Sequence, residues 1–277
     1  VFPALVYVKV IRKSFKSGKQ QRRQAFGSGV IISEDGLAVT NHHVIKNALR
    51  IQCVLGSKQQ VPAELVGKDK ETDLALLRLE YDGEEPLPTG TFGDSDSLTE
   101  GQFVMALGAP FGFTRSISLG IISHSRRYIG FQTEYKYNLW LQTDASITEG
   151  NSGGPLVNAE GEIIGINTLG ILPGAMSFAL PSNLVQKVVG RLEENGKVER
   201  AWTGLQLQPL KDFKTNTFID ADRGVLIKGV AQNSPGSHAG VQKGDLLLKI
   251  NGNAVDGTYA EMLPVIKWRL ADLPPEK

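Results

Sequence analysis

The sequence predicts a first domain built from β-strands, followed by a second, smaller domain. Short runs rich in valine, isoleucine and leucine recur along residues 1–168, separated by turns of glycine, aspartate and serine, as is typical of β-strands. One helical pattern, at residues 184–192, follows these runs, and a polar segment at residues 193–197 ends it. The chain's 277 residues are enough for two domains. We therefore expect a domain boundary just after this helix.

The composition excludes several classes of protein. Hydrophobic residues make up 41% of the chain and charged residues 21%, which is ordinary for a globular protein. No run approaches the roughly 18 consecutive apolar residues of a membrane span. The formal net charge of +1 creates no field that would attract nucleic acid or anionic lipid. We expect no membrane span in this chain, no nucleic-acid partner and, with Cys53 as the single cysteine, no internal disulfide.

The strand-like runs follow one another in chain order. Residues 1–10 favour a strand or an apolar arm, because valine, phenylalanine and tyrosine are frequent there. Residues 12–23 carry six basic side chains and no acid, which favours a solvated loop. Further strands are expected at residues 27–32, 36–40, 51–55, 61–66, 74–79, 101–107, 118–123 and 163–168, with an exposed connection at residues 83–99.

A glycine-boxed serine is the strongest candidate for chemistry. Ser152 lies between Gly150 and the pair Gly153 and Gly154, a pattern that favours a tight turn whose backbone approaches a bound group. A serine hydroxyl is a weak nucleophile unless a base takes its proton and a third group orients that base. The serine alone would usually indicate only a loop, so the prediction depends on finding both partners.

Candidates for both partners lie upstream. His43 follows a predicted strand end, and Asp73 directly precedes the apolar run at residues 74–79. The adjacent His42 and His43 would point to opposite sides of an extended chain, so only one of them can serve the serine. Asp69 lies in a charged turn where solvation is expected. The chain order His, Asp, Ser matches the two-barrel arrangement of chymotrypsin and differs from that of subtilisin or the α/β-hydrolases. Zinc spacing is absent from the four histidines and one cysteine, so we expect no metal and no cofactor.

Three segments resemble the active-site segments of the HtrA/Deg family of serine proteases: TNHHV at 40–44, TDLALL at 72–77 and TDASITEGNSGGPLVN at 143–158. The last third of the chain resembles the family's PDZ domain. The resemblance implies an all-β, chymotrypsin-like double six-stranded barrel at residues 1–196, a linker at 197–201 and an α+β PDZ domain at 202–277. The chain stops soon after a helical pattern near residues 259–270 that contains Pro264, so we expect a truncated PDZ domain without its last strand.

The resemblance implies a role for each candidate. Ser152 would attack the substrate carbonyl, His43 would transfer the proton, and Asp73 would orient His43. The backbone amides of Gly150 and Ser152 would form the oxyanion hole. Asn151 carries no charge that could pair with a newly cut N-terminus, so we expect activation by loop rearrangement rather than by propeptide cleavage.

Substrate binding is also expected from the resemblance. Thr168 to Gly170 would pair with an extended peptide by strand addition. The pocket residues would be Ile147, Thr168, Leu169, Gly170 and Ile171, and their apolar character implies small aliphatic residues before the cleaved bond. Peptide C-termini would bind at the PDZ domain through Thr203, Gly204, Leu205 and Gln206.

The implied function is ATP-independent cleavage of unfolded or misfolded polypeptides in protein quality control and the stress response. The implied assembly is a homotrimer, or a higher multiple of trimers, with Phe2 and Tyr7 as candidate contacts. Residues 126–138 match a sensor loop that could instead be an ordinary surface loop. The implied location is exported, periplasmic or secreted, or organellar; we expect any signal peptide to lie outside this chain. The rival hypotheses are a peptide-binding chaperone or scaffold with a silent protease fold, and a nucleic-acid or lipid binder using residues 12–23.

Overall fold

The computed structural model describes residues 1–16, 19–109, 116–130, 135–172, 176–211 and 221–273. The chain divides into two compact units. The first comprises Val1–Arg127 and Trp140–Val198, and the second comprises Tyr128–Leu139 and Glu199–Lys277. No helix among the described residues is both long and apolar enough to cross a membrane.

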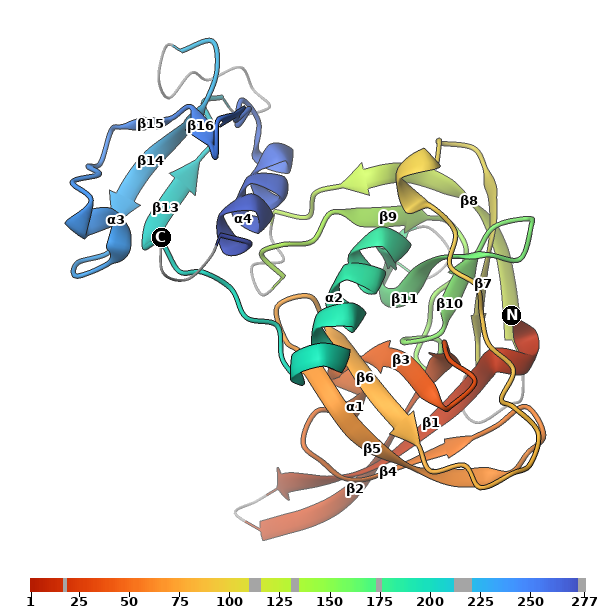
Figure 1. Ribbon diagram of the computed structural model, residues 1–277. Helices are drawn as coiled ribbons and strands as arrows, with labels where there is room; N and C mark the ends of the chain where they lie inside the picture. The colour runs from red at the N-terminus through yellow and green to blue at the C-terminus, as the bar shows by residue number, and fades with distance from the viewer. Residues whose placement is uncertain (17–18, 110–115, 131–134, 173–175, 212–220, 274–277) are drawn as a thin grey trace. The chain divides into compact units, whose positions relative to one another are not determined.

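The first barrel of the first unit is closed by six antiparallel strands (Figure 1). A short 3-10 helix, η1 (Phe2–Ala4), precedes it, and α1 (His42–Ile45) follows its third strand directly. Along the first strand the buried Val6, Val8 and Val10 alternate with less buried residues, as the period of two requires, whereas the third strand is buried at every position. In order around the barrel the strands are β1 (Leu5–Lys16), β2 (Lys19–Ile31), β3 (Leu37–Asn41), β6 (Leu74–Leu79), β5 (Gln60–Asp69) and β4 (Ala48–Val54).

The second barrel is also closed by six antiparallel strands, so the predicted double six-stranded architecture is confirmed. Its core cluster includes Leu141 and Ala179. The adjacent Trp140 and Phe178 pack edge-on against each other, with ring centroids 6.4 Å apart. The short helix η2 (Ser95–Ser97) lies in the connection between the barrels. In order the strands are β10 (Pro155–Val157), β11 (Ile163–Leu172), β12 (Met176–Pro181), β9 (Trp140–Thr143), β8 (Ser116–Arg127) and β7 (Phe103–Gly108).

The expected helix is α2 (Ser182–Asn195), which packs on strands of both barrels. Its buried stripe includes Val185, Val188 and Leu192. The sequence predicts Ser182 or Asn183 as a side-chain cap, and this prediction is wrong: Pro181 occupies the N-cap position, and the Ser182 hydroxyl donates to the Gly93 carbonyl at 2.6 Å. At the other end Gly196 adopts a left-handed φ of 69° and its N–H closes the helix on the Leu192 carbonyl.

The basic run at residues 12–23 is not the predicted solvated loop. β1 and β2 continue as a two-stranded hairpin through this segment, pairing Arg12 with Arg23 and Lys13 with Arg22 (Figure 1). The pairing of β1 with β4 ends at Arg12 after a bulge, so the hairpin extends beyond the barrel from that point.

The second unit contains a three-stranded sheet in the order β13 (Leu205–Gln208), β14 (Val225–Val230), β15 (Leu246–Leu247). Its apolar core joins Val225, Ile250 and Val255 to three residues of the last helix. The remaining elements are α3 (Pro235–His238), β16 (Lys249–Ile250), β17 (Asn253–Ala254), η4 (Ala260–Met262) and α4 (Leu263–Ala271).

Pro264 does not disturb α4, although a proline in a helix interior is unfavourable. It lies in the first turn of the helix, where a missing N–H leaves no intrahelical hydrogen bond unmade. Among the described residues, α4 is the last element and no strand follows it. The edge strand β13 and the helix α4 line the two sides of a groove.

Candidate active site

The structure brings His43 and Asp73 together. The imidazole Nδ1 lies 2.6 Å from the Asp73 Oδ2, and the His43 backbone N–H donates to Oδ1 at 2.9 Å. The Asp73 side chain is 1% exposed, whereas the His43 side chain is 40% exposed. One carboxylate thus holds both the ring and the backbone of His43, and the rest of the ring faces outward.

Asp73 adopts a left-handed backbone conformation, with φ of 64°. Aspartate tolerates this region better than most residues because its short side chain bonds locally. The Asp73 carbonyl accepts from the His42 N–H and from Asn41 Nδ2, both at 3.0 Å. These bonds fix the turn that aims the carboxylate at His43.

The two rejected alternatives can also be located. The His42 side chain is buried, and burial lowers the pKa of its imidazole, opposed by the nearby Asp73 carboxylate. Asp69 is buried rather than solvated, so that part of the prediction is wrong, and its carboxylate accepts from the Thr72 hydroxyl at 2.6 Å. Asp69 thus has a partner within its own turn, whereas Asp73 is bonded to His43.

Ser152 lies in the turn that connects β9 to β10, and this turn contacts β2 and β11. Its carbonyl accepts from the Ser28 N–H at 2.8 Å, and its hydroxyl donates to the Thr168 carbonyl at 3.3 Å. A Cβ atom added to Gly27 would lie 2.7 Å from the Val44 side chain and 3.1 Å from the Ser152 carbonyl oxygen. The serine turn and α1, which carries His43, therefore meet at Gly27. Among the described residues, no hydrogen bond joins the Ser152 hydroxyl to His43.

The backbone amides of the serine turn fall into two sets. The Asn151 N–H donates to the Thr148 carbonyl at 3.0 Å, and the Gly153 N–H donates to the Asn167 carbonyl at 2.8 Å. The N–H groups of Gly150 and Ser152 donate to no residue that the structure describes. The N–H groups of Asn151 and Gly153 are thus hydrogen-bonded within the protein. Those of Gly150 and Ser152, which the family resemblance implies as oxyanion donors, are available to a substrate.

Two further residues hold this arrangement, and the sequence analysis missed both. The buried Ser28 hydroxyl donates to the Gly150 carbonyl at 2.6 Å and accepts from the Ala109 N–H at 2.9 Å. Asn41, also buried, donates through Nδ2 to Thr168 Oγ1 at 3.1 Å as well as to the Asp73 carbonyl. The only signal was their position, beside glycines for Ser28 and before the histidines for Asn41.

The predicted pocket residues are only partly assembled. Ile147 is buried, and its carbonyl lies so close to Gly170 that any side chain there would overlap it. Thr168 is buried, Leu169 is half-buried, and Ile171 is 37% exposed. The structure therefore places Ile147 against Gly170 and leaves the Ile171 side chain at the surface.

A second groove lies within the second unit. It has a volume of about 420 Å³ between the edge strand β13 and α4. The segment predicted to bind a peptide carboxylate borders it, and the Gly236 N–H donates to the Thr203 carbonyl at 2.9 Å to fix that segment. Its lining includes Thr203, Gly204, Leu205, Gln206, Leu270 and three lysines, Lys136, Lys228 and Lys267.

Comparisons with known proteins agree with this architecture. Residues 27–166 match the trypsin-like peptidase domain family, and residues 226–267 match the PDZ domain family. A probable periplasmic serine endoprotease, DegP-like, from Marinomonas sp. is 42% identical over 254 residues, 90% of this chain and 52% of the relative. A protein of the same description from Halomonas elongata is 39% identical, over 88% of this chain and 51% of the relative. The chain thus spans about half the length of these curated relatives.

Solved structures give the same result over most of their length. An HtrA-type protease AlgW with a tripeptide has a TM-score of 0.82 and 32% identity, covering 98% of this chain and 85% of that one. A serine endoprotease from Yersinia pestis has a TM-score of 0.72 and 33% identity, covering 98% and 85%.

Two closed six-stranded barrels followed by a PDZ domain define the class as a trypsin-like peptidase with a PDZ module. Within that class, the DegP-like relatives and the HtrA-type structures both match the chain through both of its domains. The chain belongs to the HtrA/Deg family of serine proteases.

Proposed function

We propose that this chain is an ATP-independent serine endopeptidase that cleaves unfolded or extended polypeptides through an acyl-enzyme. Ser152 attacks the substrate carbonyl, and His43 takes the serine proton and later returns it to the leaving amine. Asp73 holds the imidazole in the tautomer that this requires. The observation that carries the proposal is the His43–Asp73 pair, 2.6 Å apart, beside a serine turn with two uncommitted amides.

The reaction requires the Ser152 hydroxyl to change its position. The Ser152 hydroxyl must leave the Thr168 carbonyl and turn toward the exposed side of the His43 ring. Rotation about the Cα–Cβ bond of Ser152 moves its hydroxyl between staggered positions, and a substrate strand along Thr168 to Gly170 would displace it from the Thr168 carbonyl. The Gly150 and Ser152 amides would then stabilise the negative oxygen of the tetrahedral intermediate.

The Ser152–Thr168 hydrogen bond also favours a second candidate, a peptide-binding chaperone or scaffold with a silent protease fold. A fluorophosphonate probe separates the two, because it reacts only with a serine activated by a working base and oxyanion hole. We expect a covalent adduct on the Ser152-containing peptide in a mass-spectrometric digest, together with cleavage of an unfolded protein. Holding activity against aggregation without any adduct would support the chaperone instead.

Asn151 supports a proposal about activation. Its side-chain amide donates to the Ser146 carbonyl at 3.4 Å, and its buried Oδ1 has no partner in the described chain. No acid stands here to receive a new N-terminus, so rearrangement of loops would form the active site. Intact mass measured before and after activation tests this, since propeptide removal would shorten the chain.

The groove in the second unit supports a peptide-binding role. We propose that a peptide C-terminus adds to the β13 edge, with its carboxylate against the segment from Thr203 to Gln206. The three lysines favour an anionic ligand. Burial lowers the pKa of Lys267, and the like charges of Lys136 and Lys228 lower it further.

Replacing Lys267 by methionine should therefore have two opposite effects. Affinity for a labelled peptide with a free C-terminal carboxylate should fall about fivefold, because one cation of the groove is gone. Thermal stability should stay equal or rise, because a half-buried, mutually repelling charge is removed. Fluorescence anisotropy and thermal unfolding give the two readouts, with the exposed Lys249→Met as the control. Equal affinities of both variants would contradict a role for Lys267.

Assembly, domain limits and location are proposed on the same basis. We place the protease domain at 1–196, the linker at 197–201 and the PDZ domain at 202–277. Phe2 and Tyr7 are proposed contacts of a homotrimer or a multiple of trimers; Tyr7 stacks on the exposed Phe26 with centroids 5.7 Å apart. The relatives named periplasmic support an exported location. Mass measurement in solution tests the oligomeric state.

A further inference from the structure

A basic groove lies on the first barrel, between the β1–β2 hairpin and the turn that follows α1. Its volume is about 640 Å³. The part of the chain that the structure describes supplies no ion pair to any of its cations. Four of the seven lining residues are basic and none is acidic. The basic residues are Arg12, Lys13, Arg23 and Lys46, and the others are Asn47, Ala48 and Leu49.

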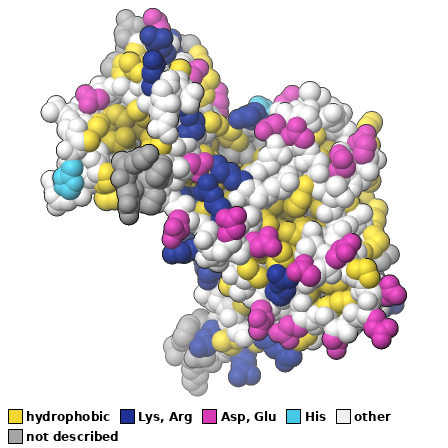
Figure 2. All heavy atoms as spheres, viewed as in Figure 1, with side chains coloured by type: hydrophobic (Ala, Val, Ile, Leu, Met, Phe, Trp, Pro, Cys, Tyr) yellow, Lys and Arg dark blue, Asp and Glu magenta, His cyan; other side chains and the backbone are white. Residues whose placement is uncertain are grey.

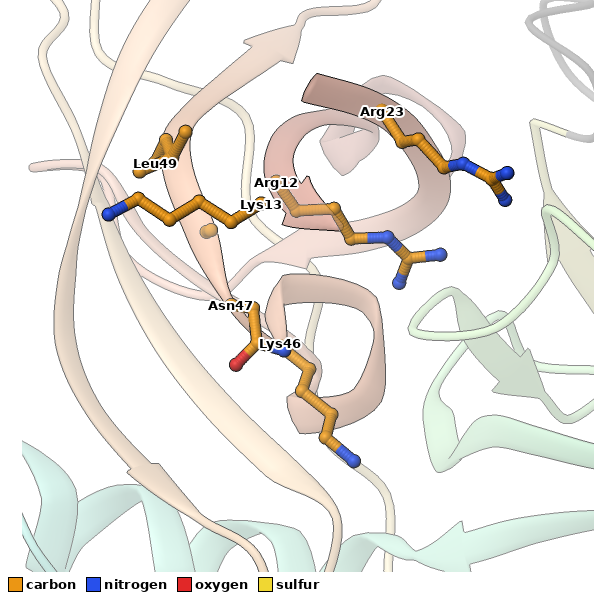
Figure 3. A pocket seen from close by; sticks show the side chains of 7 residues that line it. Arg12, Lys13, Arg23, Lys46, Asn47 and Leu49 are labelled. Carbon is orange, nitrogen blue, oxygen red and sulfur yellow. The ribbon is translucent and has the colours of Figure 1, made fainter. Parts of the chain in front are cut away.

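The charged groups of three of these cations lie on one side of the hairpin. Figure 3 shows the head groups of Arg12, Arg23 and Lys46 extending to the same side, with Lys13 and Leu49 extending the other way. Figure 2 shows Lys and Arg side chains gathered at the lower edge of the first barrel, where this hairpin lies. We call Arg12, Arg23 and Lys46 the basic site.

The basic site is destabilising unless an anion occupies it. Arg12 and Arg23 are direct cross-strand partners, and like charges placed opposite each other weaken an antiparallel pair. Guanidinium groups bind carboxylates through two parallel hydrogen bonds, so two neighbouring arginines suit such a ligand. A ligand carboxylate would relieve the repulsion that the sequence builds into the hairpin.

β2 and α1 connect the basic site to the proposed catalytic residues. Arg23 precedes Ser28 by five positions on β2, which corresponds to about 17 Å at ~3.3 Å per residue. The Ser28 N–H donates to the Ser152 carbonyl. Lys46 follows His43 by three positions, which is about one helical turn.

The groove lies on the side where the leaving part of a substrate exits. Ser152 is bordered by Thr168 of β11 through its hydroxyl and by Ser28 of β2 through its carbonyl. The proposed function places substrate residues that precede the cleaved bond along β11. Residues that follow the bond therefore pass on the β2 side, beside the exposed Phe26 and Arg23.

We propose that the basic site is a substrate subsite that binds aspartate or glutamate side chains about three to five residues after the cleaved bond, from the strand rise of ~3.3 Å per residue. This inference rests on the proposed endopeptidase function. The site gives the protease a selectivity for charge after the cleaved bond, in addition to the preference for small aliphatic residues before the bond that the sequence predicts. Because the groove is open to water, the preference is modest and depends on salt.

Two matched peptides test the proposal. Both carry valine before the intended bond and an amidated C-terminus, which keeps a free terminal carboxylate out of the second unit's groove. They differ only at the third to fifth residues after the bond, Glu-Glu-Glu in one and Gln-Gln-Gln in the other. We expect kcat/KM to be about fivefold higher for the glutamate peptide at low salt, and this ratio to shrink toward one in 0.5 M NaCl. Mass spectrometry identifies the cleaved bond.

A neighbouring arginine provides the control. Arg23→Gln should reduce the glutamate preference to less than about twofold, because it removes one of the three site cations. Arg22→Gln removes the same charge one position away, on the opposite face of the strand and outside the groove lining, and should keep the preference. Equal cleavage of both peptides by the unaltered protein, or equal loss in the two variants, would overturn the subsite.

Peptide binding tests the subsite even if the proposed endopeptidase function is wrong. If neither peptide is cleaved and the fluorophosphonate probe gives no adduct, the endopeptidase function fails. Anisotropy with the Ser152→Ala protein still tests the subsite: tighter binding of the glutamate peptide, lost in Arg23→Gln, supports it, and equal binding refutes it. A labelled single-stranded oligonucleotide that outcompetes the glutamate peptide through Arg23 would assign the groove to nucleic acid and refute the subsite.

Discussion

Replacing Asp73 by asparagine is expected to lower kcat for an unfolded protein substrate by about 10⁴-fold. The Asp73 carboxylate accepts from both Nδ1 and the backbone N–H of His43. An asparagine amide in the same place can present its NH₂ group to Nδ1, which favours the tautomer whose Nε2 already carries a proton. That tautomer cannot take the Ser152 proton. Asparagine also accepts the left-handed φ of 64°, so the fold should be retained.

Two variants calibrate this result. Ser152→Ala should cost about 10⁶-fold in kcat, because removal of the nucleophile stops the covalent route. Asp69→Asn changes another buried carboxylate four residues earlier, one that accepts from Thr72, and should leave kcat within about threefold, as expected for a group outside the reacting atoms. Steady-state kinetics and thermal unfolding of all three variants provide the comparison. A large loss in Asp69→Asn together with a small loss in Asp73→Asn would show that the orienting acid was misassigned.

The barrels and the catalytic pair could be predicted because their signals are local. Apolar runs of period two bounded by turn residues describe strands wherever they occur. His43 and Asp73 became candidates because each adjoins such a run, and a strand end is a rigid support. The family resemblance then assigned His43 rather than the adjacent His42. The structure pairs these two side chains at 2.6 Å, across 30 positions of sequence.

The hairpin at residues 12–23 shows where local signals fail. Six cations without an acid favour solvation, and the paired arginines oppose strand pairing, so a loop was the reasonable expectation. The strands persist because β1 and β2 are already paired along the barrel from Leu5 to Ile11, and continuing an existing pair needs no new loop closure. Tertiary pairing overrides the charge pattern there.

Ser28 and Asn41 could not be selected from sequence for a different reason. Their hydrogen bonds reach residues far along the chain: Ser28 binds Gly150, and Asn41 binds Thr168. Small polar residues beside glycine or histidine are common in turns, so nothing local distinguishes a positioning role. Only the closure of two barrels against each other within the first unit brings these partners together.

Replacing Gly153 by alanine is expected to lower the free energy of unfolding by about 3 kcal/mol or more and to abolish most proteolysis. Gly153 follows Ser152 at a φ of 86°, a region that L side chains rarely adopt. An added Cβ would overlap the Ser28 carbonyl and the Thr40 hydroxyl and would lie 3.1 Å from the Asn41 amide nitrogen. The Thr40 hydroxyl already donates to the Ser28 carbonyl at 2.7 Å, so neither can withdraw without breaking that bond.

Gly161→Ala separates backbone strain from overlap. Gly161 has a similar φ of 81°, but an added Cβ there would meet no atom within 4 Å. Its substitution should cost only the strain of the left-handed conformation, about 1 kcal/mol, with kcat unchanged. Chemical denaturation measures both variants, and the difference between them is the contribution of close packing under the serine turn. Equal destabilisation would mean that the turn yields to the new methyl group. The rigidity on which the uncommitted Gly150 and Ser152 amides depend would then be lacking.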